Sequence, residues 1–201
     1  MGQGPRYRVM FRRRREKRTD YRMRKAMIIS KTPRLVVRGS LKHMNVQVVG
    51  ALPIGDEMLA SANSKSLASF GWKAPTGNIP AAYLTGYLLG KKAVAAGVET
   101  AILDIGLVKT TVGARNFAAL KGAVDAGLEV PYDESILPSN DRITGEHIVE
   151  CAKKFQEADP SIYEERFSQY LRDLRPEELP KHFAQVKGKI DEAFKGGEAE
   201  A

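Results

Sequence analysis

The residues best placed to do chemistry in this 201-residue chain are cations gathered at its beginning. Residues 1–42 hold fifteen Lys and Arg against two acids, Glu16 and Asp20, which is a local net charge of +13. The whole chain carries +8, so the rest of it is acidic, with a net charge of −5. Clustered guanidinium and ammonium groups neutralise phosphates and release their counterions. The asymmetry predicts a polyanionic partner, which we interpret as a nucleic acid.

A solvated basic tail and a lipid-binding tail are the alternatives for this segment. Its cations exceed what solubility requires, and it has few large apolar residues to anchor in a bilayer. No run of the sequence approaches the roughly 18 apolar residues of a membrane span, and no apolar region follows the first cations as in a secretory signal. We therefore expect no membrane partner.

Residues that could hold a metal or attack a substrate are scattered along the sequence. His43, His147 and His182 are far apart, and Cys151 is the single cysteine, with the helical spacing of a small apolar residue. No HExxH, CxxC, GxGxxG or P-loop pattern occurs. The sequence predicts no metal, no cofactor, no small-molecule substrate and no catalytic residue.

One enzymatic alternative comes from the order of the expected elements. A strand meander followed by a helix and a strand is the order of a ribonuclease H-like sheet, where clustered carboxylates hold two divalent ions. The candidate ligands are Asp56, Glu57, Asp104 and Asp125. Such nucleases need an acid on the first strand, but the first strand expected here, RLVVR at 34–38, has none. A nuclease therefore stays a minor alternative to a binding protein.

Trp72 and Lys73 form an aromatic–cation pair in the Gly/Pro-rich loop at 70–78. Such a pair could stack on an unpaired base or ribose. Equally, Trp72 could pin the loop to the body of the protein. Both interpretations stay open at the level of the sequence.

The basic segment is expected to hold only a short helix. The four adjacent arginines at 12–15 repel one another and should stay extended or frayed without a partner. Thr19 or Asp20 can cap a helix over YRMRKAMII, which would turn Met23, Ala26 and Met27 toward the body. If that helix started earlier when bound, one face would collect Arg14, Arg18, Arg22 and Lys25.

The middle of the chain predicts a mixed sheet with helices packed on it, an α/β fold. Strands are expected at 34–38, 44–49, 57–62, 100–105 and 128–130, and helices at 78–97 and 115–126. Asn78 and Pro80 suit the start of the first helix. Gly86 and Gly90 lie inside it, where each costs about 1 kcal/mol relative to Ala, so we expect a close approach to the sheet there.

The end of the chain predicts amphipathic helices. Thr144 can cap one that turns Cys151 or Ala152 inward, Ser161 and Glu164 form a capping box for the next, and Pro176 starts the last. We divide the chain into a basic arm with a short helix (1–31), an α/β core (32–141), a helical extension (142–195) and a mobile tail (196–201).

Three long blocks resemble the L18 family of large-subunit ribosomal proteins, in its archaeal and eukaryotic form, whose eukaryotic counterpart is numbered five. The blocks are TDYRMRKAMIISKTPRLVVR (19–38), GNIPAAYLTGYLLGKKAVAAGVETAILDIGL (77–107) and FAALKGAVDAGLEVPYDESILPSNDRITGEHI (117–148). The resemblance covers nearly the whole chain. It implies a mixed sheet with ribonuclease H-like topology, as in ribosomal translational components, without nuclease activity.

The resemblance also implies a function in the cytoplasmic ribosome. Members bind 5S rRNA and attach it to the large-subunit rRNA in the central protuberance, beside another 5S-binding ribosomal protein. Most of the RNA contact is implied for the arm, at Arg6, Arg8, Arg12, Arg13, Arg14, Arg15, Lys17, Arg18, Arg22, Arg24 and Lys25. Weaker candidates are Lys31, Arg34 and Arg38, and residue chemistry alone adds Trp72 and Lys73. A ribosome-independent RNA-binding adaptor is the remaining alternative.

Overall fold

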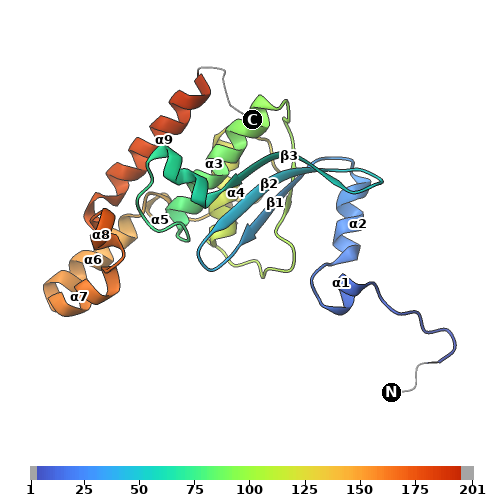
Figure 1. Cartoon of the computed structure of the whole chain (residues 1–201), viewed down its shortest axis with the longest axis horizontal. Coiled ribbons are helices and arrows are strands. Elements are labelled where there is room, and N and C mark those ends of the chain that lie inside the picture. The colour runs from blue at the N-terminus through green and yellow to red at the C-terminus, as the bar shows by residue number, and fades with distance from the viewer. Residues whose placement is uncertain (1–3, 196–201) are drawn as a thin grey trace.

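A four-stranded mixed sheet forms the centre of the protein, seen in a computed structural model that describes residues 4–195 (Figure 1). The strands are β1 (Arg34–Gly39), β2 (Met44–Ala51), β3 (Asp56–Asn63) and β4 (Ile102–Asp104), in the order β3-β2-β1-β4. β2 is antiparallel to both β1 and β3, whereas β4 is parallel to β1. The α/β prediction is confirmed. The tail predicted to be mobile, 196–201, lies outside the described residues.

The strand expected at 128–130 is reduced to a single parallel bridge between Thr100 and Glu129. The bridge lies at the edge of β4 that faces away from β1, because the amide of Ile102 donates to Pro33 while that of Ala101 donates to Glu129. Successive residues of a strand present their amides to opposite neighbours. The contact therefore continues the sheet by one residue pair beyond β4.

Alternation along β1 divides its side chains between two faces. Leu35 and Val37 are fully buried in the core. Arg34, Val36 and Arg38 project from the other side, where they line a cleft beneath helix α2 (Tyr21–Ile29). One face of the sheet is therefore apolar and packed, and the other, called here the open face, carries charge.

Helices α3 (Ile79–Ala95) and α4 (Arg115–Asp125) cover the apolar face. As predicted, the Asn78 side chain caps α3 by accepting from the amide of Ala81, and Pro80 occupies the first turn. The close approach at Gly86 involves α4 and not the sheet, because a Cβ there would overlap the backbone of Ala119. A Cβ at Gly122 of α4 would overlap the carbonyl oxygen of Tyr83 in return, so the two helices interlock through glycines.

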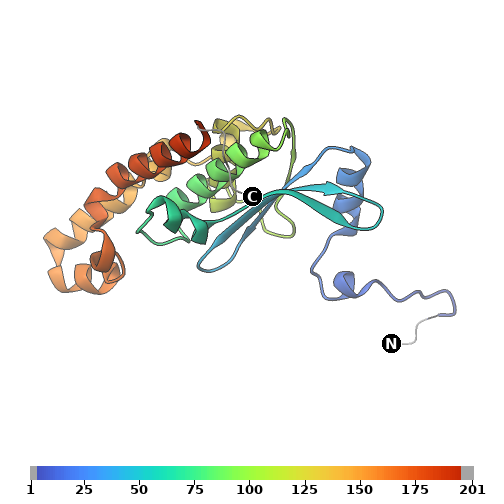
Figure 2. The same ribbon diagram turned by 45° about the horizontal axis from the view of Figure 1, so that its top comes forward.

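The chain after α4 is helical, as predicted. A 3₁₀ turn (Glu134–Ile136) and the short helix α5 (Asn140–Thr144) come first. They are followed by α6 (Glu146–Ala158), α7 (Pro160–Phe167), α8 (Tyr170–Asp173), a 3₁₀ turn (Pro176–Glu178) and α9 (Leu179–Lys195). A further 3₁₀ helix, Ser64–Phe70, follows β3. α9 packs along α3 and buries Leu179, Phe183, Val186 and Ile190. α6–α8 extend away from the sheet, at the opposite end of the molecule from α1 and α2 (Figures 1 and 2).

Details of these helix boundaries differ from the prediction. Thr144 ends α5 and does not cap α6, because Gly145 adopts a left-handed backbone (φ +90°) between the two helices and packs tightly against Leu179. Asp159, and not Ser161, caps α7, since its carboxylate accepts from the Ser161 amide. Ala152 is the buried residue of α6, while Cys151 is exposed. Over residues 4–195, no helix has the length and apolar character required to cross a membrane.

Candidate nucleic-acid interface

The four adjacent arginines of the arm form one helical turn, α1 (Arg12–Arg15), whereas the sequence predicted an extended or frayed segment. Neighbouring groups offset their mutual repulsion. Glu16 lies 3.3 Å from the Nε atoms of both Arg12 and Arg18, and the Nε of Arg13 donates to the Thr19 hydroxyl at 2.9 Å. The turn ends at once, because Lys17 adopts a left-handed backbone (φ 52°). α1 and α2 are therefore separate helices.

Helix α2 begins at the predicted cap. The Asp20 carboxylate accepts from the amides of Arg22 and Met23, and Tyr21 packs against Phe11 with ring centroids 5.6 Å apart. None of its residues is fully buried; Met27 is half-buried, whereas Met23 and Ala26 are exposed. The predicted apolar contact with the body is therefore made mainly by Met27. The cap and the ring contact fix where the helix starts.

Most cations of the arm have no acidic partner. Within residues 4–195, the ion pairs of the arm are those of Arg12 and Arg18 with Glu16 and of Arg24 with Asp56. The others are exposed and make no ion pair in this range: Arg6, Arg8, Arg13, Arg14, Arg15, Lys17, Arg22, Lys25 and Lys31. An exposed, uncompensated set of this kind can pair with phosphate oxygens, and its guanidinium groups can do so bidentately.

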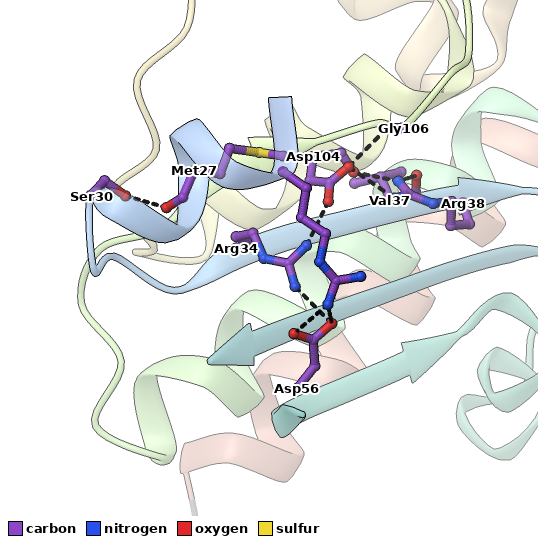
Figure 3. Close-up of polar contacts among 9 residues, drawn as sticks. Met27, Ser30, Arg34, Val37, Arg38, Asp56, Asp104 and Gly106 are labelled. Carbon is purple, nitrogen blue, oxygen red and sulfur yellow. Dashed lines mark hydrogen bonds and ion pairs between the residues drawn. The ribbon is translucent and has the colours of Figure 1, made fainter. Parts of the chain in front are cut away.

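Arg34 is a predicted RNA contact that the fold removes from the surface. Its side chain is only 5 % exposed; Nη1 donates to Asp104 at 2.9 Å, and Nη2 lies 2.9 Å from an oxygen of Asp56. Arg38 is nearly half exposed, although its Nη2 donates to Asp104 at 2.8 Å. The two arginines flank Asp104 on the open face of the sheet (Figure 3). Arg34 is thus a structural residue of this face, while Arg38 can still reach a ligand.

The Asp104 carboxylate is held in its charged form by these neighbours. Its burial opposes ionisation, but the hydrogen bond and charge of Arg38, the amide of Gly106 and the charge of Arg34 together lower its pKa below the ordinary value. All three partner residues lie on β1 or in the turn after β4. Asp104 therefore ties the parallel strand pair β1–β4 together.

Trp72 is buried, with an exposed fraction of 5 %. Its ring stacks on His182 of α9 at a centroid distance of 5.2 Å, and its indole N–H points to the Pro75 carbonyl. The ring offers no free face to a base in this structure, so Trp72 pins its loop to α9. Lys73 next to it is exposed, and its backbone amide donates to His182.

The four carboxylates of the nuclease alternative do not gather. Asp125 accepts from the Tyr83 hydroxyl on the helical side of the sheet, while Asp56 and Asp104 lie on the open face with Arg34 between them. A guanidinium therefore occupies the space between two carboxylates where a nuclease would hold divalent ions. In the part of the chain that the structure describes, no group of three His, Cys, Asp or Glu could hold a metal ion, and His43, His147 and His182 stay apart.

A cleft of about 420 Å³ separates α2 from the open face. Its walls include Met23 and Met27 from the helix and Val36, Gln47 and Met58 from the sheet. Arg24 crosses it and binds Asp56 through both carboxylate oxygens, at 2.9 and 2.8 Å. Sequence reasoning considered Asp56 only as a metal ligand. No local signal indicates its pairing with a residue 32 positions earlier.

Known proteins resemble this chain over its whole length. The family described as ribosomal large subunit proteins 60S L5 and 50S L18 matches residues 5–98 and 95–133. The chain is 50% identical over 203 residues to large ribosomal subunit protein uL18 of Caldivirga maquilingensis, covering 100% of this chain and 98% of that protein. It is 52% identical over 193 residues to the protein of the same name from Methanothermobacter thermautotrophicus, covering 96% and 99%.

Proposed function

The chain belongs to the family of ribosomal large-subunit proteins 60S L5 and 50S L18, and from this premise we propose that it binds 5S rRNA and attaches it to large-subunit rRNA in the central protuberance. As a member in its archaeal and eukaryotic form, it is a structural constituent of the large ribosomal subunit and not an enzyme. Ribosomal RNA and ribosomal proteins are its partners. The choice of 5S rRNA, the location and a neighbouring 5S-binding protein are our proposal.

The observation that carries the proposal is the exposed, uncompensated charge of the arm. Arg6, Arg8, Arg13–Arg15, Lys17, Arg22 and Lys25 are exposed and unpaired within residues 4–195, at one end of the molecule (Figure 2). We assign these side chains, with Arg12 and Arg18 once they leave Glu16, to phosphates. Lys31, Arg38 and Lys73 are weaker candidates. Because phosphate contacts carry no sequence information, the folded body must contribute selectivity by recognising RNA shape.

Three residues predicted to contact RNA are not part of the proposed interface. Arg34 and Trp72 are buried, and exposing either would break contacts that hold the fold. Arg24 is turned toward the sheet and binds Asp56, so we assign it no phosphate. The proposed RNA surface is therefore the outer side of α1 and α2 and the chain before them.

We propose that the sheet has ribonuclease H-like topology. Strand order β3-β2-β1-β4, with the bridge at Glu129 beyond β4, supports this assignment. We also propose the organisation into an arm (1–31), an α/β core (32–141) and a helical extension (142–195). The burial of apolar residues from β1 onward and its absence in α1 and α2 support the first boundary.

The test is selectivity in a mobility-shift assay. Full-length protein is titrated into 5S rRNA and into tRNA, a folded RNA of smaller but comparable size, at the same salt concentration. We expect at least tenfold tighter binding to 5S rRNA, because phosphate contacts alone would not distinguish the two. Equal affinity would instead indicate a general RNA-binding adaptor. Mg²⁺-dependent cleavage that disappears in Asp104→Asn would support the nuclease alternative.

A further inference from the structure

Asp56 joins the basic arm to the sheet, although the proposed RNA contacts do not include it. Both of its oxygens accept from Nη2 of Arg24, and one also lies 2.9 Å from Nη2 of Arg34. Arg34 in turn pairs with Asp104, and Asp104 with Arg38. Charges of alternating sign therefore run from Arg24 on α2 through Asp56, Arg34 and Asp104 to Arg38 on β1. Figure 3 shows the last four of these residues on the open face.

Within residues 4–195, Arg24 and Asp56 form the only side-chain hydrogen bonds and ion pair between α2 and the sheet. α2 has no fully buried residue, and only Met27 among its apolar side chains is half-buried and lines the cleft. The backbone turns at a left-handed residue before α2, Lys17, and at another after it, Lys31. The segments that flank α2 therefore do not hold its axis in a fixed direction. A helix with so little apolar burial depends on its polar anchor for its orientation.

The ion pair between Arg24 and Asp56 is partly shielded from solvent, which strengthens the attraction between the two charges. The Arg24 and Asp56 side chains are each about one-third exposed (35% and 32%). Beneath them, the Nε and Nη2 atoms of Arg34 are buried without a hydrogen-bond acceptor in the described part of the chain, so Nη2 has only the charge of Asp56. The Arg24–Asp56 hydrogen bonds join two charged groups, and such charge-assisted bonds are roughly twice as strong as bonds between neutral groups.

We propose that Asp56 is a positioning residue for RNA binding, which pins Arg24 and so holds α2 on the open face before RNA arrives. This inference rests on the proposed function, since it describes how the arm is presented to RNA. Pre-ordering the arm removes part of the entropy that a flexible segment loses on binding. Asp56 and Arg24 then strengthen RNA binding without touching a phosphate.

The distinguishing variants are Asp56→Asn and Arg24→Gln, each with a matched control. Glu57→Gln makes the same charge change one residue away, at an exposed side chain with no ion pair within residues 4–195. Arg22→Gln makes the same change as Arg24→Gln on an exposed residue of the same helix. Arg24→Gln also leaves Arg34 with both of its carboxylates, so it tests the anchor without altering the sheet.

The first readout needs no RNA. Amide hydrogen exchange of residues 21–29 is expected to accelerate at least tenfold in Asp56→Asn and in Arg24→Gln, with exchange in α3 unchanged. The two controls should leave α2 as in the original protein. Unchanged α2 exchange in both anchor variants would overturn the proposal, whatever RNA the protein binds.

The second readout is the salt dependence of RNA affinity. Arg24→Gln is expected to weaken binding to 5S rRNA about tenfold with an unchanged slope of log K against log salt, whereas Arg22→Gln should reduce that slope by about one. Asp56→Asn should weaken binding although it removes a negative charge, and it should add nothing in an Arg24→Gln background. Tighter binding by Asp56→Asn, as expected for Glu57→Gln, would contradict the proposal. If the original protein did not prefer 5S rRNA, the proposed function would fail while the exchange result would stand.

Discussion

The first and last long helices of the described chain, α2 and α9, are attached to the α/β fold in different ways. At the C-terminal end, α9 buries Leu179, Phe183, Val186 and Ile190 against the core, and the Tyr87 hydroxyl donates to Asp191 at 2.6 Å. At the N-terminal end, α2 buries no residue fully and is held through Arg24 and Asp56. Both helices contact the same domain, but only α9 belongs to its apolar core.

The difference shows which end keeps its charged side chains in solvent. Apolar burial contributes about 25 cal/mol per Å² and responds little to salt. The Arg24–Asp56 pair holds α2 without burying it, so the other cations of the arm stay exposed to solvent. The C-terminal end is therefore part of the fold, while the N-terminal end keeps its charges available for a polyanion.

The largest expected effect is on RNA affinity, when cations are removed from the arm and, for comparison, from the C-terminal helices. Replacing Arg12–Arg15 by Gln should weaken 5S rRNA binding on the order of 10³-fold, at about 1 kcal/mol for each charge-assisted contact. Replacing four exposed cations of the C-terminal helices, Lys153, Lys154, Arg172 and Lys181, should change the affinity less than about threefold. Filter binding of both variants makes the comparison, and equal losses would mean that total charge alone determines the affinity.

A second substitution tests how each helix is docked. Phe183→Ala should reduce the free energy of unfolding by about 3 kcal/mol, through lost burial and a residual cavity. Met27→Ala on α2 should reduce it by less than about 1 kcal/mol, because that side chain is only half-buried. Urea denaturation followed by circular dichroism measures both. A loss at Met27 as large as that at Phe183 would place α2 in the core.

The smallest expected effect is a pH dependence confined to the C-terminal end. Burial, with the nearby charges of Lys73 and Lys189, lowers the pKa of His182, against an opposing influence of Glu178. The neutral ring stacks on Trp72 and accepts from the Lys73 amide. Since the unfolded chain takes up the proton more readily, the free energy of unfolding should decrease as the pH falls below about 6.5.

Unfolding measured at pH 7.5 and pH 5.5 checks this, with His182→Gln as the variant that should lose the difference. Asp104 does not interfere, because its lowered pKa makes its contribution disappear only under more acidic conditions, below about pH 4. The same pH dependence in His182→Gln would assign the effect to another group. RNA affinity of the folded protein should not follow His182.

Helices and strands were predictable from the sequence where a single capping residue or a regular alternation of side chains determines them. The cap of α3 at Asn78 and the alternation of Arg34 to Arg38 are of this kind. Gly86 predicted a close approach, but a glycine does not specify its neighbour, which is Ala119 of α4 and not the sheet. Gly145 adopts a left-handed backbone where Thr144 was predicted to cap α6, and Leu179, far along the chain, lies close enough to exclude a side chain there.

The candidate interface was predictable as a segment and less so residue by residue. The composition of the arm was enough to single out its exposed cations. Arg34 is held on the open face by Asp56 and Asp104 from other strands, and Trp72 is stacked on His182 from α9. Both are contacts between distant parts of the sequence. The pairing of Asp56 with Arg24 is of the same kind, which is why its carboxylate suggested a metal ligand first.

The most direct test of the account is the salt dependence of 5S rRNA binding by the full-length protein. If the arm neutralises about 6–10 phosphates, the association constant should fall roughly 10³–10⁵-fold between 50 and 200 mM salt, linearly on a double-logarithmic plot. A nearly flat response over that range would contradict the assignment of the arm's cations to RNA phosphates.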